Sequence, residues 1–565
     1  MTAPTESPNA AGFTHKQILT ILSGLMLGML LGALDQTIVS TSIRTIADDL
    51  QGYSLQAWVT TAYLITATLA TPLYGKLSDM YGRKPFYLAA ISLFVIGSLL
   101  CTIAQSMYQL AAFRAFQGLG AGGLMSLALT ILGDIVGPRE RAKYQGYFLA
   151  VFGTSSVVGP VLGGVISGQS EILGITGWRW VFLVNVPIGL VALVVVSRVL
   201  RLPKVDKSKV PVDWFGVLML AVGIVPLLVV AEQGREWGWG SGGSIACYVI
   251  GVLGVLGFLA VEARQGDAAL IPLRMFKNST FAVGVGISFV VGMAMFGGIT
   301  LLPQYLQVVQ GSSPTLAGMQ MLPLVAGMMT ASIISGQLIS RTGSYRWFPR
   351  IGAVLVTLGL FLLHYVSATT QLWVVMAFML IVGLGLGNLM QPLTLALQNA
   401  LPPKDMGVST ASATFFRQIG GTLGVAVFLS ILFSLLTPNI SDELHAAATR
   451  PEFQAAVAQG VRSDNPADAA LANGLVRQDH SAASEVMKDS SIIQQLDPTL
   501  AQPFKAGFAD AMDTVFLAAS GIAALALVLV AFWKEVPLRL AGGIQARNEA
   551  QRKEAEVEAA ADSLS

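Results

Sequence analysis

The sequence has few charged residues, few histidines and almost no cysteine. Asp, Glu, Lys and Arg make up only 12% of the 565 residues, about half the share in an ordinary soluble domain. The net charge of +2 and the lack of a basic block argue against nucleic acid as a partner. The two cysteines, Cys101 and Cys247, lie in apolar runs, and the four histidines are scattered. Neither a disulfide framework nor a bound metal is therefore expected.

Long apolar segments dominate the chain instead. Apolar residues make up 54% of it, and the mean hydropathy is +0.66. A helix needs about 20 apolar residues to cross about 30 Å of hydrocarbon. About fourteen segments meet this length, which predicts an all-α membrane protein. They centre on Met29, Ile65, Ile96, Leu124, Val157, Leu190, Val222, Val252, Gly286, Val325, Val356, Met379, Val425 and Ala524.

Lys and Arg gather in alternate connections between these segments, which predicts the orientation in the membrane. Both the N-terminal tail, residues 1–16, and the C-terminal tail, residues 538–565, are expected in the cytoplasm. No cleavable signal peptide is expected. Residues 438–507 are polar and are expected outside, with short helices in the Ala-rich patches 453–458 and 467–475. The high Ala and Gly content suggests the cell membrane of a bacterium.

An internal repeat divides the chain. Gly75, Leu77 and Gly82 keep the same spacing as Gly336, Leu338 and Gly343, although Asp79 becomes Ser340. Internal repeats of this kind are typical of transporters. The repeat predicts two six-helix halves on either side of an inserted hairpin. The expected segments are 17–204 for the first half, 205–275 for the hairpin, 276–437 for five spans of the second half, and 508–537 for its last span.

Four motifs make the chain similar to the major facilitator superfamily, and within it to the fourteen-span drug:proton antiporters. They are the segments 34–39 (LDQTIV), 75–84 (GKLSDMYGRK), 110–118 (LAAFRAFQG) and 153–164 (GTSSVVGPVLGG). Arg44 stands where the first motif of the family usually has a proline. The resemblance covers the whole chain except the outer loop and the tails. It implies the major facilitator fold with two extra linker helices, no enzymatic activity, and the proton motive force in place of a cofactor.

Asp35 and Arg114 are the expected proton-coupling residues. An acid within an apolar span is costly and marks a functional site by default. Arginine stays protonated in proteins, so Arg114 needs a partner, and Asp35 is the obvious one. Packing roles are the alternative for both residues. The resemblance implies that both take part in proton coupling.

The segment after the second span is expected to form a cytoplasmic latch between the two halves. Asp79 is suited to cap a helix N-terminus and to pair with Arg83, and Gly75 allows close helix approach. Gly82 and Lys84 complete the motif. A plain turn with basic residues for orientation is the alternative.

The fifth span carries the motif that resembles those of exporters. Small residues let helices touch backbone to backbone, and proline removes a helical hydrogen bond. The segment is expected to form a tight seam between the two halves. Its residues are Gly153, Gly159, Pro160, Gly163 and Gly164.

The substrate cavity is expected among polar, aromatic and methionine-rich spans, since such walls adapt to varied apolar ligands. Ordinary helix packing is the alternative for each residue except Arg417, which needs a partner in the membrane. The GxGxxG pattern at 118–123 lies inside a span and is attributed to packing, not to a nucleotide. The cavity candidates are Tyr63, Gln304, Tyr305, Asn388, Gln391, Phe416 and Arg417.

These observations predict a proton-coupled secondary exporter of amphiphilic, cationic drugs that works by alternating access and confers antibiotic resistance. Its expected partners are small amphiphilic molecules and the lipid bilayer. A first alternative is a lipid or secondary-metabolite exporter that reaches an envelope partner through residues 438–507. A second is a membrane sensor or scaffold that transports nothing. The coupling motifs argue against the second alternative, whereas the sequence does not separate the first from a drug exporter.

Overall fold

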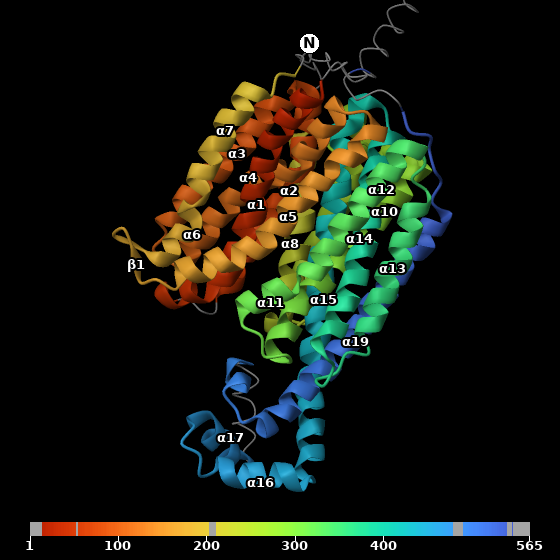
Figure 1. Cartoon of the computed structure of the whole chain (residues 1–565). Helices are drawn as coiled ribbons and strands as arrows, with labels where there is room; N and C mark the ends of the chain where they lie inside the picture. Colours follow the sequence, from red (N-terminus) through yellow and green to blue (C-terminus); the bar gives the residue numbers. More distant parts are fainter. Residues whose placement is uncertain (1–13, 52–54, 203–210, 478–489, 540–544, 546–565) are drawn as a thin grey trace, which may run out of the picture.

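Long helices run side by side through most of the molecule (Figure 1). The computed structural model describes residues 14–51, 55–202, 211–477, 490–539 and 545. The described chain starts and ends at the same end of the bundle, and the helices of the 438–507 region lie beyond the opposite end. We call these the inner and outer ends, after the orientation that the Lys and Arg distribution predicts.

The first half of the bundle contains the first six expected spans. Thr14 begins the first helix with a capping box that it shares with Gln17, which satisfies backbone N–H groups that have no helical partner. A short hairpin at the outer end, β1 (Glu171–Ile172) paired with β2 (Ile175–Thr176), precedes the sixth span. The helices are α1 (His15–Asp49), α2 (Gln56–Tyr81), α3 (Arg83–Thr102), α4 (Met107–Ile135), α5 (Pro138–Ser167), α6 (Trp180–Leu183) and α7 (Asn185–Val199).

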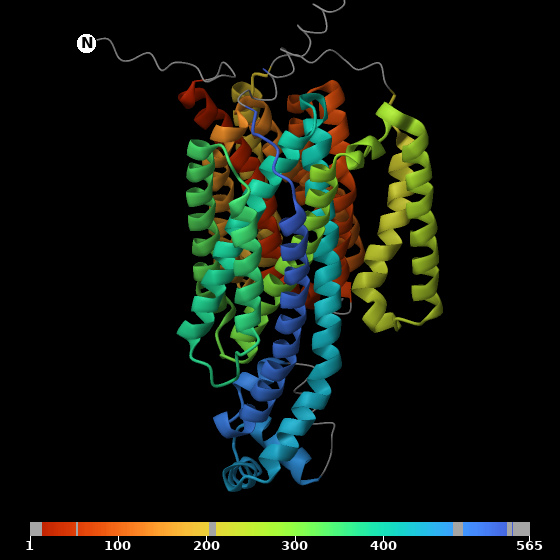
Figure 2. The same cartoon turned by 90° about the vertical axis from the view of Figure 1, so that its right-hand side faces the viewer.

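The inserted hairpin consists of α8 (Trp214–Trp237) and α9 (Gly242–Gln265). It lies beside the bundle (Figure 2), and only α8 packs extensively against it. The contact joins Leu220, Ile224 and Leu228 of α8 to Ile65 of α2 and Phe415 of α15 (Met406–Ala448). The hairpin therefore rests on one helix from each half.

The second half repeats the arrangement of the first. Its large buried core is separate from that of the first half. Gly82 after α2 and Gly343 after α12 both adopt positive φ, +98° and +75°, which side chains with a Cβ rarely do. The sequence repeat is thus also a repeat of backbone geometry. The helices are α10 (Ser279–Val308), α11 (Pro314–Gln320), α12 (Leu322–Thr342), α13 (Trp347–Leu363), α14 (Leu372–Ala400), α15 and α19 (Pro498–Phe532).

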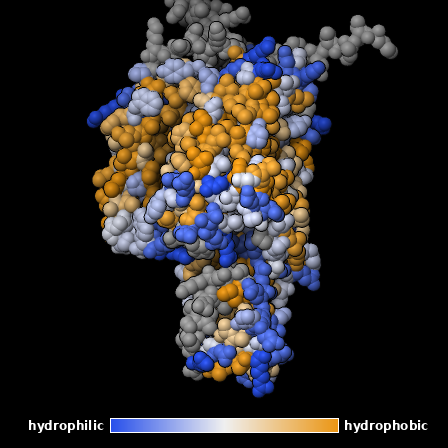
Figure 3. Space-filling model, turned by 90° about the vertical axis from the view of Figure 1, so that its left-hand side faces the viewer, coloured by the Kyte–Doolittle hydropathy of each residue, from blue (hydrophilic) through white to orange (hydrophobic). Residues whose placement is uncertain are grey.

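Among the described residues, twelve helices are long and apolar enough to cross a membrane. Every expected span centre lies in a helix. The two expected spans outside the twelve are α2 and α13, and α13 has 17 residues. Their crossing stays a prediction. Figure 3 shows apolar residues over the flank of the bundle and polar residues toward its ends, as lipid contact requires.

The segment boundaries differ from the expected ones at three places. α15 continues to Ala448 and α19 begins at Pro498, so both helices extend into the region 438–507. Figure 2 shows these two helices carrying the outer region away from the bundle. α19 ends at Phe532, and residues 533–539 follow it without helix. Most of both tails and residues 205–210 lie outside the described residues.

The outer region folds onto the two extended helices. The Ala-rich patches form the two expected helices, α16 (Pro451–Gly460) and α17 (Pro466–Val476). Phe453, Leu471 and Leu500 are buried together with the core of the second half. An envelope partner for this region stays a prediction.

Candidate functional site

Asp35 lies fully buried near the middle of α1 and is surrounded by hydrogen-bond donors. Its Oδ2 accepts a bond from Nη1 of Arg114 at 2.5 Å, so the expected pair is formed. Its Oδ1 accepts bonds from Nε2 of Gln117 at 3.0 Å and from Nδ2 of Asn185 at 2.8 Å. Asp35 is 0% and Arg114 1% exposed. Three donors on two other helices suit an ionised carboxylate.

The guanidinium of Arg114 is held on several sides. The ring of Tyr63 lies 4.0 Å from its carbon, a cation–π arrangement that stabilises a charge away from water. Its Nη1 also donates to Oε1 of Gln117 at 2.7 Å. Nε2 of Gln117 donates in turn to Ser98 at 2.8 Å. Tyr63, an expected cavity residue, therefore belongs to the Asp35–Arg114 site.

This arrangement is a buried polar network around one carboxylate. A proton on Asp35 removes the negative charge that Arg114, Gln117 and Asn185 all face. Arg114 is then a buried cation without a counter-charge, which is an unfavourable state. A proton on Asp35 would therefore be expected to weaken the contacts that hold α1 against α4 and α7.

The Asp79 segment joins the two halves at the inner end. The two carboxylate oxygens of Asp79 accept bonds from the backbone N–H groups of Gly407, at 3.1 Å, and Val408, at 2.8 Å. These groups lie in the first turn of α15, whose N–H groups have no helical acceptors. Arg83 pairs with Asp79 at 2.5 Å and with Asp134 at 2.8 Å. A carboxylate of the first half therefore caps a helix of the second half.

Further contacts close the same end. A Cβ on Gly75 would lie 2.8 Å from the carbonyl oxygen of Gly407, so only glycine permits this approach of α2 to α15. Buried Arg141 of α5 donates to Gln398 of α14, and Gln398 donates to the carbonyl of Leu129. The two halves thus meet at the inner end through α2, α4 and α5.

The other two latch residues do not cross between the halves. Gly82 provides the positive-φ turn between α2 and α3. Lys84 donates to the carbonyl of Ser197 at 2.6 Å, within the first half.

Asp79→Asn tests the latch. We expect transport to fall about tenfold, because an amide offers one acceptor for two N–H groups and no charge for Arg83, and a weakened cap costs about 1–2 kcal/mol. The measurement is the initial rate of transport in proteoliposomes at equal protein content. Lys84→Gln is the control and should change the rate less than twofold. Equal rates for Asp79→Asn and the unaltered protein would show that the latch has no part in transport.

The glycines of α5 contact two different partners, and the expected seam is wrong in part. A Cβ on Gly153 would meet Val325 of α12, and Pro160 contacts Gly318 of α11, so these two do face the other half. A Cβ on Gly159 would collide with Thr37 of α1, and one on Gly163 would approach the backbone of Ile38 at 3.0 Å. Gly159 and Gly163 therefore tighten α5 against α1 within the first half. Nothing lies within 4 Å of a Cβ at Gly164.

The structure disperses the expected cavity residues. Tyr305 donates to the carbonyl of Ser367 in the loop after α13, which is a structural contact at the outer end. Asn388 donates to the carbonyl of Leu384 in its own helix. Phe416 packs on Phe276, with ring centroids 6.3 Å apart, against the cluster that holds the inserted hairpin. Gln304 in α10 is half-buried and Gln391 in α14 is buried.

Arg417 remains a candidate for the cavity. It lies seven residues after Thr410, so both occupy the same face of α15, about 10 Å apart along the helix. Thr410 accepts a bond from Gln398, which belongs to the contacts that close the inner end. Arg417 is half-buried, and among the described residues its guanidinium has no hydrogen bond, ion pair or ring contact. An unpaired cation at this depth is available to a ligand.

Sequence reasoning missed several residues of these networks, among them Gln117, Asn185, Asp134 and Gln398. Gln117 stands three residues after Arg114 within the segment 110–118, so its position did carry a signal. The other three are joined to their partners only by the fold.

Comparisons with known proteins agree with this architecture. Residues 25–425 match the Major Facilitator Superfamily. The multidrug transporter protein MdtP of Bacillus subtilis is 33% identical over 525 residues, which cover 92% of this chain and 93% of MdtP. Multidrug resistance protein 3 of the same organism is 37% identical over 433 residues, 76% of this chain and 83% of that protein. The proton:xylose symporter XylE has a similar fold, with a TM-score of 0.55 at 14% identity over 94% of this chain and 99% of XylE.

Proposed function

This chain belongs to the major facilitator superfamily, and on that premise we propose that it exports amphiphilic compounds in exchange for protons. A transporter and not an enzyme is what the family indicates, and relatives named as multidrug transporters support efflux as its direction. The observation that carries the proton step is the fully buried carboxylate of Asp35, held by Arg114, Gln117 and Asn185.

A contiguous set of contacts links the proton site to the joint between the halves. Two residues after Asp35 on α1, Thr37 donates to the carbonyl of Ser155 on α5 at 3.0 Å and also meets Gly159. Gly153 and Pro160 of the same helix face α12 and α11 of the other half. A shift of α1 on protonation would move α5, and through it the seam. This route supports alternating access driven by the proton.

The charge of the cargo follows from the charges that face it. A cationic cargo and a proton would both be attracted to the carboxylate of Asp35. Competition between them would couple release of the cargo to uptake of a proton. Arg417 favours an anionic group as well, because its positive charge has no anionic partner among the described residues. We infer that the cargo site also accepts acidic groups, so that cationic and acidic amphiphiles are both exported. Export of lipids or secondary metabolites remains the alternative with the same machinery.

The substitution Arg417→Gln separates these two kinds of cargo. We expect export of a carboxylated fluorescein dye to fall roughly 10- to 100-fold, the range for loss of a hydrogen bond to a charged group of about 1.5–3 kcal/mol. Ethidium export should change less than threefold. The measurement is dye efflux in proteoliposomes, with Arg417→Lys as the control that keeps the charge. Equal loss for both dyes would mean that Arg417 has a structural role.

Proton exchange itself is tested with the purified protein in proteoliposomes. An imposed pH gradient should drive dye transport against its concentration gradient and acidify the compartment that the dye leaves. A protonophore should stop both. Dye movement that ignores the pH gradient would overturn the proton-coupled proposal, and no movement of any dye would favour the sensor alternative.

A further inference from the structure

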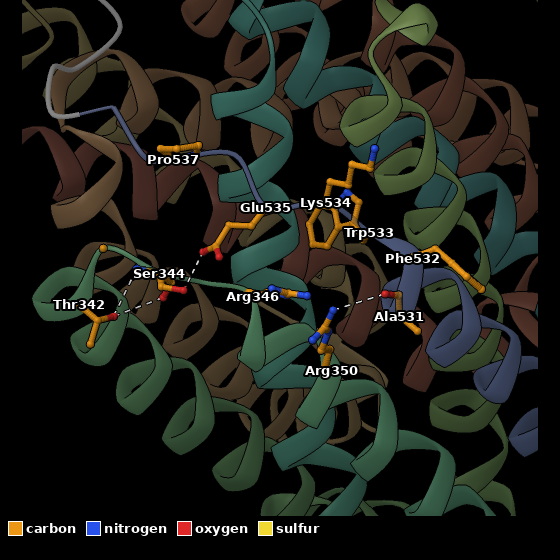
Figure 4. Close-up of a pocket in the computed structure, with 11 residues that line it drawn as sticks. Thr342, Ser344, Arg346, Arg350, Ala531, Phe532, Trp533, Lys534, Glu535 and Pro537 are labelled. Atoms are coloured by element: carbon orange, nitrogen blue, oxygen red, sulfur yellow. Dashed lines mark hydrogen bonds between the residues drawn. The ribbon is translucent and has the colours of Figure 1, made fainter.

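A pocket of about 630 Å³ lies at the inner end of the second half, far along the chain from the proton site (Figure 4). It lies between the end of α12, the start of α13 and the segment that follows α19. Three basic residues line it: Arg346, Arg350 and Lys534. Figure 4 shows both arginine side chains directed toward the last turn of α19, and Lys534 at the rim pointing away from them.

The walls of the pocket are fixed by hydrogen bonds. The carboxylate of Glu535 accepts bonds from the hydroxyl of Ser344 and the backbone N–H of Tyr345, both at 2.8 Å. The backbone N–H of Val536 donates to the Tyr345 hydroxyl at 2.9 Å. Asn399 of α14 binds the carbonyl of Pro537 at 2.9 Å. The segment after α19 is thus folded back as a wall, and the pocket is a built feature.

The positive charge in this pocket is only partly neutralised from within. The carboxylate in its lining, Glu535, accepts its bonds from two neutral donors, Ser344 and Tyr345, so one negative charge stands against three positive ones. Arg350 reaches the carbonyl of Ala531 at 3.4 Å and lies over the ring of Trp347. Among the described residues, the side chains of Arg346 and Lys534 have no hydrogen bond or ion pair. The pocket therefore suits an anionic group.

The internal repeat places different charges at this turn in the two halves. In the first half, Arg83 is neutralised by Asp79 and Asp134. The counterpart of Asp79 in the second half is Ser340, which offers no charge. Arg83 itself corresponds to Ser344, whereas Arg346 and Arg350 correspond to Pro85 and Ala89, so these two cations are additions of the second half.

Apolar side chains lead from the pocket along the flank of the bundle. Trp347 at the start of α13 is 63% exposed, and Phe532 at the end of α19 is 78% exposed. Aromatic residues of this kind gather at membrane interfaces. α13 and α19 pack on each other, and exposed side chains follow both toward the membrane centre. These are Ile351, Val354, Leu358 and Phe361 on α13, and Leu525 and Val528 on α19.

We propose that this pocket binds the phosphate headgroup of an anionic phospholipid, whose acyl chains lie along α13 and α19. Basic pockets between spans at the membrane surface bind such headgroups. The exposed apolar side chains of α13 and α19 next to the pocket favour a lipid over free phosphate, because only a lipid has acyl chains to contact them. The pocket also borders the joint between the halves, because Arg139 of α5 lies against Gly343 in its lining. A bound lipid is therefore placed to stabilise the form in which the inner end is closed.

The test compares lipids and variants in detergent solution. Phosphatidylglycerol added to the purified protein should raise its Tm and remain bound in native mass spectrometry, whereas phosphatidylcholine should do neither. The double substitution Arg346→Gln and Arg350→Gln should weaken phosphatidylglycerol binding about 30-fold, since each basic residue near an anionic surface contributes about fivefold. Arg341→Gln is the matched control, because Arg341 is exposed at the same end of α12 but does not line the pocket.

Two results would overturn the proposal. One is equal binding of phosphatidylglycerol by the double variant and the unaltered protein. The other is an equal rise of Tm with millimolar inorganic phosphate, which would mean a site for free anions. If the double variant is not monodisperse, Arg346→Gln alone carries the test with an expected fivefold effect, because that side chain is exposed.

Discussion

Asp35→Asn should reduce gradient-driven export to background while counterflow of dye without a gradient continues. Asparagine has nearly the shape of aspartate, and its oxygen can still accept a bond from Gln117 or Asn185, but it takes up no proton. Exchange of one dye molecule for another needs only alternating access. Under the proposed mechanism, transport against a gradient also requires Asp35 to take up and release a proton. The measurement is a pair of assays on the same proteoliposomes, active transport under a pH gradient and counterflow at uniform pH.

Stability must be separated from coupling in this test. The Asn substitution leaves Arg114 buried without a counter-charge, which costs about 3–5 kcal/mol. The double variant with Arg114→Gln removes both charges and should recover part of the lost Tm without restoring active transport. Asp48→Asn is the control, because Asp48 lies on the same helix but is exposed. Active transport at the normal rate by Asp35→Asn would place the proton site elsewhere.

Gly159→Leu should abolish transport, the second large effect that we expect. A side chain at Gly159 collides with Thr37, two residues from Asp35 on α1, in a contact that has no free space. Overpacking of this kind costs about 1–3 kcal/mol, and here it also separates the two helices that connect the proton site to the seam. The measurement is transport rate against the amount of folded protein recovered from the membrane.

Gly164→Leu provides the comparison within the same helix. Gly164 is five residues further along α5, and a Cβ there meets nothing within 4 Å. We expect this variant to transport at more than half the normal rate. If both leucine variants lose transport equally, the effect belongs to glycine content in α5 and not to the contact with α1.

The sequence carried enough information to predict the helices and the Asp35–Arg114 pair. Apolar length predicts spans, and an acid in the first span and an arginine in the fourth have few other charged partners within the apolar segments. The helix that Asp79 caps could not be predicted from the sequence. Capping chemistry depends on the residue itself, but the N-terminus of α15 lies more than 300 residues away, and only the packing of the halves brings it there.

The errors have the same origin. Small residues in α5 indicate a close approach of helices but not the partner, so the sequence does not show that Gly159 and Gly163 face α1 and not the other half. Tyr305 and Asn388 are residue types that are common in binding sites, yet both donate their hydrogen bonds to backbone carbonyls of the second half. Nothing in the sequence around Asn185 indicates its hydrogen bond to Asp35. A single asparagine at the start of a span is as consistent with capping a helix end as with binding a buried carboxylate.

The inserted hairpin makes the two sides of the transporter unequal. The halves meet along two seams, α2 with α15 and α5 with α12. α8 lies across the first seam and touches both of its helices. A molecule dissolved in the bilayer would meet the two added helices on that side, whereas the insert does not cover the α5–α12 seam. If an amphiphile passes sideways between the bilayer and the interior, we therefore expect it to do so along the α5–α12 seam, although the underlying repeat would allow two such routes.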